Sequence, residues 1–170
     1  MIRSARLDDA SRLAEIHIGS WQAAYRDLLP GDFLAGLNDE LASRTGQWQD
    51  WLSIHSERRA VLVVVDDDQV VGFAHLGPSG DKDLKASQVG ELYAMYLDPA
   101  YYRQGWGSQL MDAAFEDLRA SGFVEGSLWV MTDNTAARSF YERHSWQPDG
   151  KTADHCVGIA IPAVRYRIAL

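Results

Sequence analysis

Glu91 to Met111 reads ELYAMYLDPAYYRQGWGSQLM and passes from an aromatic, apolar segment through two glycines into a helical pattern. Residues 90–97 are typical of a buried strand, and Asp98-Pro99 ends it. Apolar residues between 105 and 121 recur at helical spacing, and Gly122 is a stop signal. The sequence therefore predicts a strand, a short loop and an amphipathic helix, in that order.

The junction between that strand and that helix contains Gly105 and Gly107. A helix start leaves N–H groups unpaired, glycine lets a ligand approach the backbone, and the helix dipole adds about half a positive charge. Such a junction can bind a pyrophosphate. Leu110 stands where a dinucleotide fingerprint needs its third glycine, and the chain contains neither a P-loop run nor a Gly-x-Ser-x-Gly elbow. By spacing alone, a simple tight turn explains the two glycines equally well.

The other segments predict further helices and strands on both sides of the junction. Before it, the sequence predicts a short strand at 2–6, helices over 7–24 and 32–55 with a break near Leu37-Asn38, and a hairpin of 60–65 with 70–76. After it, the sequence predicts strands over 126–132, 147–153 and 161–169 and a helix over 134–145. Because there is no internal repeat and no linker, we expect one mixed α/β (α+β) domain over residues 1–170.

The composition excludes two classes of partner. Of the 170 residues, 46% are hydrophobic and 24% are charged, as in a packed globular domain. Sixteen Lys and Arg against twenty-four Asp and Glu give a net charge of −8, which argues against nucleic acid and against anionic membranes. An acidic chain can still bind an anionic ligand where backbone dipoles form the site.

Targeting segments, disulfides and metal motifs are not apparent in the sequence. The start of the chain lacks the apolar core of a signal peptide, and no apolar run approaches the ~20 residues that cross a bilayer. Cys156 is the single cysteine, so no intramolecular disulfide is expected, and the five histidines lack metal-ligand spacing. We therefore expect a soluble cytoplasmic protein without a metal.

Two motifs resemble those of the GCN5-related N-acetyltransferases, the GNAT superfamily. Residues 102–107, Tyr-Arg-Gln-Gly-Trp-Gly, are similar to its motif A, Gln/Arg-x-x-Gly-x-Gly/Ala after a strand, with Tyr102 in place of Gln or Arg. Residues 134–142 resemble its motif B, Asn-x-x-Ala-x-x-Phe-Tyr, and Ser145 replaces the usual glycine after that helix. Residues 20–30 are also similar to bacterial members, so the resemblance covers nearly the whole chain.

The resemblance implies the GNAT fold, a twisted mixed sheet of about seven strands flanked by helices. Coenzyme A would enter where strand 90–98 separates from strand 126–132. The implied activity is transfer of the acetyl group of acetyl-CoA, the acyl-donor substrate, to a primary amine by direct attack, with a general base and a general acid.

The sequence does not decide between three classes of acceptor amine. These are a small amine or polyamine, an antimicrobial, and a peptide N-terminus or lysine. The alternative function is a non-catalytic acyl-CoA-binding or sensing module of the same fold. Because dimers are common among relatives, a homodimer is one state to expect.

The resemblance assigns the acetyl-CoA site to three segments. The backbone of 103–108 would hold the pyrophosphate, and the main chain of Met95 and Leu97 would pair with the pantetheine arm like an added strand. Asn134 is a ligand contact, the helix N-cap, or both, and Arg138 is a phosphate contact or a solvated charge. The candidate cofactor-binding residues are Met95, Leu97, Arg103, Gln104, Gly105, Trp106, Gly107, Ser108, Asn134 and Arg138.

Tyr141 is the candidate general acid. It follows Asn134 by seven residues, which is about two helical turns, so the two side chains share a face. A phenol with a pKa near 10 is suited to protonating the departing thiolate. The alternative interpretation of Tyr141 is an ordinary half-buried aromatic side chain.

Glu91 is the candidate general base. It opens an otherwise apolar strand, where unpaired burial of a carboxylate is costly, and burial would raise its pKa. It lies fourteen residues before Gly105, like the catalytic glutamate of the histone-acetyltransferase branch. The alternatives are an ordinary strand-end charge and a base that acts through a water relay.

Trp21 and Tyr25 are the candidate acceptor-binding residues. They lie four residues apart on the first predicted helix, and in the GNAT fold the early helices cover the acceptor side. Core packing is the alternative for both. His75, on the hairpin, is a second proton relay or an ordinary strand histidine.

Overall fold

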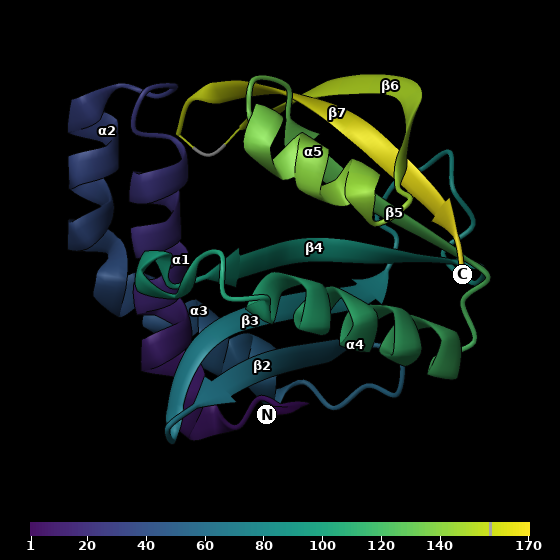
Figure 1. Cartoon of the computed structure of the whole chain (residues 1–170), viewed down its shortest axis with the longest axis horizontal. Coiled ribbons are helices and arrows are strands. Elements are labelled where there is room, and N and C mark those ends of the chain that lie inside the picture. The colour runs from purple at the N-terminus through teal and green to yellow at the C-terminus, as the bar shows by residue number, and fades with distance from the viewer. Residues whose placement is uncertain (157) are drawn as a thin grey trace.

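The computed structural model describes residues 1–156 and 158–170 and is drawn in Figure 1. Its strands are β1 (Ile2–Ser4), β2 (Ala60–Asp66), β3 (Gln69–Pro78), β4 (Val89–Leu97), β5 (Glu125–Met131), β6 (Gln147–Cys156) and β7 (Ala160–Ala169). Its α-helices are α1 (Ala10–Ala24), α2 (Gly31–Gly36), α3 (Leu41–Ser53), α4 (Trp106–Ala120) and α5 (Thr135–Arg143). The predicted break near Leu37-Asn38 is a 3-10 turn, Leu37–Glu40, between α2 and α3.

The strands form one seven-stranded mixed sheet in the order β1-β2-β3-β4-β5-β7-β6. Every neighbouring pair is antiparallel except β4 and β5, which are parallel. The parallel register runs from Val89 opposite Glu125 to Leu92 opposite Leu128, although β4 continues to Leu97. The two central strands therefore separate along their second halves, at the place that the resemblance implies.

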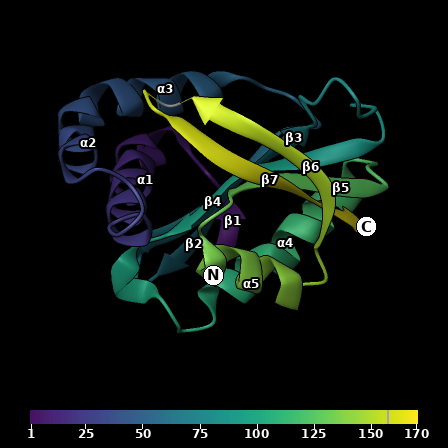
Figure 2. The same ribbon diagram turned by 90° about the horizontal axis from the view of Figure 1, so that it is seen from above.

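Helices cover both faces of the sheet, as Figure 2 shows from above. On one face, Leu110, Met111, Ala114 and Leu118 of α4 form the buried stripe of an amphipathic helix, and α5 packs against the same apolar cluster. On the other face, Leu13 and Ile16 of α1 and Trp48 of α3 pack on Phe73 of β3. The molecule thus has three layers, with α1 to α3 and α4 to α5 on opposite sides.

A β-bulge in β4 lies where the pairing with β5 stops. His75 of β3 is opposite Ala94 and Leu76 is opposite Leu92, so Tyr93 is the extra residue. A bulge bends its strand and increases the local twist. Gly77 makes room for it, because a Cβ atom there would lie 2.6 Å from the Tyr93 hydroxyl. The separation of β4 from β5 therefore begins at a local feature that the sequence specifies.

Candidate active site

The separated halves of β4 and β5 open a cavity of about 550 Å³, which we name the splay cleft. Its walls are the second half of β4, the loop before α4, the end of β5 and one side of α5. Seven of the ten predicted cofactor-binding residues line it, and these are Met95, Leu97, Arg103, Gly105, Gly107, Ser108 and Asn134. The segments that resemble motif A and motif B therefore line the same cavity.

The start of α4 faces this cleft through a strained turn. Gly105 is the N-cap residue with φ +87°, and Arg103 just before it has φ +61°. Left-handed backbone favours glycine, which explains Gly105. The first-turn N–H groups of α4 lack intrahelical partners, so the turn can bind an anion. Gly107 has a packing reason as well, because a Cβ atom there would lie 3.3 Å from the Phe140 ring.

The free edge of β4 presents backbone groups to the same cleft. The Asp98 N–H donates to the Val71 carbonyl of β3 at 2.8 Å. Because backbone groups alternate in direction along a strand, those of Met95 and Leu97 point away from β3. The Ser20 hydroxyl of α1 donates to the Leu97 carbonyl at 2.6 Å and so fixes the end of this edge.

Three predicted cofactor residues are not among the lining residues of the splay cleft, and their contacts with acetyl-CoA stay predictions. The Gln104 amide donates to the Ala100 carbonyl at 3.2 Å, and Trp106 packs against the core under α4. The Arg138 guanidinium donates to the Tyr166 hydroxyl and to the Thr132 carbonyl, both at 3.0 Å, so it holds α5 to the sheet. These contacts give each of the three side chains a structural role outside the cleft.

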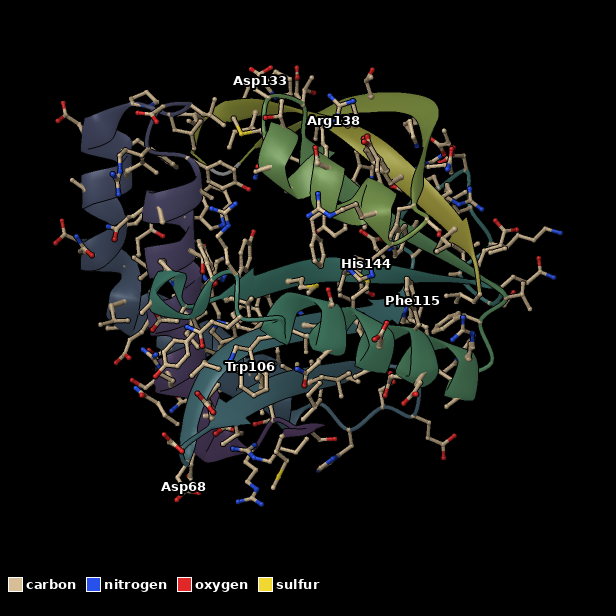
Figure 3. All side chains as sticks on the ribbon, in the orientation of Figure 1. Asp68, Trp106, Phe115, Asp133, Arg138 and His144 are labelled. Carbon is tan, nitrogen blue, oxygen red and sulfur yellow. The ribbon has the colours of Figure 1, made fainter. Side chains whose placement is uncertain are left out.

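Sequence reasoning missed Arg143 and Phe140, which line the splay cleft from α5. The signal was present, because Ala136, Phe140 and Arg143 have helical spacing on one face. The next residue along, His144, lies beside α4 in Figure 3, and its Nε2 is 3.1 Å from the Ser108 hydroxyl. The C-terminal end of α5 therefore contacts the first turn of α4.

A second cavity of about 770 Å³, the aromatic cavity, lies on the α1 and α3 face. Its Trp and Tyr lining residues are Trp21 of α1, Tyr25 just after α1, Trp48 and Trp51 of α3, Tyr93 and Tyr96 of β4, and Trp129 of β5. His17, His75 and His155 also line it. The two cavities meet, since they share Tyr25, Tyr93, Ala94, Tyr96, Trp129, Val130 and Met131. Both predicted acceptor residues, Trp21 and Tyr25, line the aromatic cavity.

These two side chains also have packing partners. The Trp21 indole N–H donates to the Tyr96 hydroxyl at 2.9 Å, and the Trp21 and Tyr25 rings meet edge to face at 4.9 Å. Tyr25 belongs to a small buried cluster with Ile18 and Leu34. Cavity lining and core packing therefore coexist at both positions.

Glu91 lies in the wall of the aromatic cavity. Its Oε2 accepts the Gly80 N–H at 2.9 Å and the Ser79 hydroxyl at 3.2 Å. Burial raises the pKa of Glu91 above its usual value, the nearby Asp81 adds to the rise, and the Gly80 hydrogen bond opposes it. Glu91 is thus a fixed carboxylate that binds a proton more readily than an exposed one.

Tyr141 lines the splay cleft, on the other side of the shared wall from Glu91. Burial raises the pKa of its phenol well above the ordinary value, and the neighbouring Tyr25 adds to the rise. Asn134 lines the same cleft and also caps α5, because its Oδ1 accepts the Ala137 N–H at 3.1 Å. Tyr141 therefore stays protonated at neutral pH.

Two of the histidines that line the aromatic cavity, His17 and His75, are uncharged at neutral pH. Burial lowers the pKa of His75 to about 4 and that of His17 to about 3. His75 lies among rings, 5.0 Å from that of Tyr93 and 5.1 Å from that of Trp51. These contacts fit an ordinary buried strand histidine better than a proton relay.

An ion-pair cluster fixes the loop between β3 and β4 over the aromatic cavity. Arg165 of β7 donates to Asp81 at 3.0 Å, to Asp83 at 2.9 Å and to Asp149 at 2.8 Å, and it is 4% exposed. Asp81 also accepts the Trp129 indole N–H at 3.1 Å. Because Ser79 and Gly80 precede Asp81, the cluster positions both donors to Glu91.

Metal groups and membrane spans are not found in the described part of the chain. Within residues 1–156 and 158–170, no three His, Cys, Asp or Glu side chains are arranged to hold a metal ion. In the same residues, none of the helices has the length and apolar character to cross a membrane.

Comparison with known proteins gives consistent matches. The model of the acetyltransferase (GNAT) family matches residues 21–146. The uncharacterized N-acetyltransferase YuaI of Bacillus subtilis is 31% identical over 144 residues, which cover 85% of this chain and 78% of that protein.

Solved structures give the same fold at low sequence identity. The PaiA N-acetyltransferase of Thermoplasma acidophilum, in complex with coenzyme A, has a TM-score of 0.70 at 20% identity over 100% of this chain and 98% of that one. YncA of Salmonella typhimurium, with its cofactor acetyl-CoA, has a TM-score of 0.68 at 18% identity, over 100% and 93% of the two chains.

Proposed function

This chain belongs to the GNAT family of acetyltransferases and is an N-acetyltransferase, and from that premise we propose that it transfers the acetyl group of acetyl-CoA directly to a primary amine. The observation that carries the proposal is the placement of Glu91 and Tyr141. They line two cavities that share one wall at the point where β4 leaves β5. A base on the acceptor side and an acid on the donor side are what direct transfer requires.

The splay cleft fits an anionic, extended donor. The N–H groups at the start of α4 would hold the pyrophosphate, with Arg103 and Arg143 as neighbouring cations. The free edge of β4 would pair with the amide groups of the pantetheine arm through Met95 and Leu97. These contacts would leave the thioester near the shared wall, within reach of the aromatic cavity.

The reaction needs three proton movements and one acyl transfer, followed by the return of Glu91 to its base form. Glu91, directly or through a water molecule, takes a proton from the acceptor ammonium. The freed nitrogen attacks the thioester carbonyl carbon, a C–N bond forms and the C–S bond breaks. The departing sulfur takes its proton from the Tyr141 hydroxyl, the second proton of the attacking nitrogen restores that hydroxyl through solvent, and Glu91 returns its proton to solvent, so the products are an amide, coenzyme A and one released proton.

The test is release of coenzyme A thiol from acetyl-CoA across a panel of small amines and peptides, with the acetylated amine identified by mass spectrometry. We expect equal amounts of thiol and N-acetyl product with at least one amine. Binding of acetyl-CoA without turnover on any amine would contradict the proposal. That result would favour the non-catalytic acyl-CoA-binding module.

A further inference from the structure

The aromatic cavity has walls made of ring surfaces. Trp51 of α3, 39% exposed, meets the fully buried Trp48 edge to face at 5.0 Å, and the His75 ring lies 5.1 Å from Trp51. Rings from β4 and β5, Tyr93 and Trp129, continue the same lining. Aromatic rings bind other flat rings through stacked and edge-to-face contacts. The lining therefore favours a flat aromatic occupant.

The charges of the cavity limit the occupant to one ammonium group. Among its lining residues within the described chain, Glu91 is the single carboxylate and Arg59, exposed at the surface, is the single guanidinium. The neighbouring Asp81 is already bonded to Arg165 and to Trp129. A polyamine would bring one or more further cations into the aromatic cavity, whose described lining offers no second carboxylate to pair with them, and burying an unpaired cation is costly.

The position of Glu91 determines how a bound amine is oriented in the aromatic cavity. Its second neighbour along β4, Tyr93, belongs to both cavities. An amine held at Glu91 therefore lies beside the shared wall, and the rest of the molecule extends along the rings toward Trp51. The volume of about 770 Å³ is in the range of small-molecule sites.

We propose that the acceptor is a primary monoamine whose body is one or two aromatic rings, bound with its amine at Glu91 and its ring against Trp51 and Trp129. The proposal rests on the proposed acetyltransfer, and it selects one class from the amines that the sequence left open.

The first experiment compares acceptors at saturating acetyl-CoA. We expect kcat/KM for 2-phenylethylamine to exceed that for ethylamine, spermidine and a lysine peptide by tenfold or more. A higher kcat/KM for spermidine or for the peptide would overturn the aromatic acceptor while leaving acetyltransfer intact. Absence of turnover on all four amines with acetyl-CoA bound would instead contradict the proposed function.

The second experiment removes one ring of the lining. Trp51 is 39% exposed, so Trp51→Ala leaves the core in place. We expect about a tenfold rise in KM for 2-phenylethylamine, with KM for ethylamine and acetyl-CoA unchanged. Trp51→Phe should restore most of the loss. Ile54→Ala, at an exposed residue just after α3 outside the cavity lining, is the matched control and should behave as wild type.

A binding measurement makes the result independent of turnover. Calorimetric titration of 2-phenylethylamine into the protein with coenzyme A should give a Kd that Trp51→Ala weakens about tenfold. An equal effect of Trp51→Ala on ethylamine, or no effect on either amine, would overturn the assignment of the ring to this wall.

Discussion

Burial changes the pKa of Glu91 and that of Tyr141 in the same direction but with different consequences. Desolvation disfavours the charged form of each group, so both pKa values rise. For Glu91 the rise moves a carboxylate toward neutral pH, where it exchanges protons with an amine more effectively. For Tyr141 the rise keeps the hydroxyl protonated, as a proton donor must be. Desolvation therefore favours the proposed role of Glu91, whereas for Tyr141 it keeps the proton in place and makes the phenol a weaker acid than a free tyrosine.

Replacing Tyr141 by Phe tests the proposed acid. Tyr141→Phe keeps the ring that packs near Trp146, at 6.4 Å between centroids, and removes the hydroxyl alone. We expect kcat to fall by roughly 10²-fold, because the thiolate must then leave without a positioned proton, while KM for acetyl-CoA changes little. Steady-state kinetics with the best amine of the panel measures both constants.

Tyr101 offers the matched control for this substitution. Its hydroxyl lies 3.4 Å from Gln69, outside the lining of both cavities, so Tyr101→Phe should keep the wild-type kcat. An unchanged kcat in Tyr141→Phe would remove Tyr141 from the catalytic group.

The C-terminus of α5 shows why one departure from the family motif is tolerated. The Trp146 N–H donates to the Tyr141 carbonyl at 3.1 Å and the Ser145 N–H donates to the Glu142 carbonyl at 3.1 Å. This is the Schellman pattern, and it places Ser145 in the left-handed region with φ +67°. The motif survives without glycine, although its backbone conformation disfavours a Cβ atom.

Ser145→Gly should therefore stabilise the protein. Removing the Cβ atom from the left-handed backbone raises the free energy of unfolding by about 1–2 kcal/mol. The greater conformational freedom of glycine in the unfolded chain lowers it again by part of that amount. We expect a net gain of about 0.5–1 kcal/mol, or about 2 °C in Tm, with kinetics unchanged. Thermal unfolding measures the shift. Ser121→Gly, at the end of α4 with φ −76°, is the control and should not stabilise. A lower Tm in Ser145→Gly would contradict the claim that the left-handed backbone at Ser145 destabilises the protein.

Across the whole molecule, local patterns predict elements and motifs, and long-range contacts do not follow from them. The loop before α4 and the cap at Asn134 are each encoded within a few residues, so their positions in the splay cleft were accessible from the sequence. The aromatic cavity joins Trp48, Trp51 and Trp129 from elements far apart in the chain. Nothing in their spacing indicates that they meet.

The contacts of Arg138 and Arg165 have the same physical explanation. The resemblance implies that Arg138 is a phosphate contact or a solvated charge, and in the structure its guanidinium donates to the Tyr166 hydroxyl, 28 residues later. The Arg165 cluster, which joins residues 84 apart, was likewise not visible in the sequence. Side chains with several chemically suitable partners are assigned only by the fold.

The Arg165 cluster makes a prediction that belongs to the whole molecule, because it ties the β3–β4 loop to β6 and β7. Arg165→Met removes the cation that Asp81, Asp83 and Asp149 share. Asp83 keeps Lys151 and Asp149 keeps Arg167, whereas Asp81 keeps the Trp129 indole N–H. We expect a loss of about 2 kcal/mol in the free energy of unfolding, less than for a fully buried pair because the carboxylates are partly exposed. Urea unfolding measures this loss.

The same substitution should change the pH dependence of activity. Asp81 already raises the pKa of Glu91, and without Arg165 its negative charge is less compensated, so the pKa of Glu91 rises further. The base form is lost as pH falls through that pKa, so the acid limb of kcat/KM should move to higher pH in Arg165→Met. Arg167→Met, which breaks ion pairs to Glu125 and Asp149 but does not contact Asp81, should leave the limb in place. Coincident acid limbs in Arg165→Met and wild type would show that the cluster holds the loop without influencing Glu91.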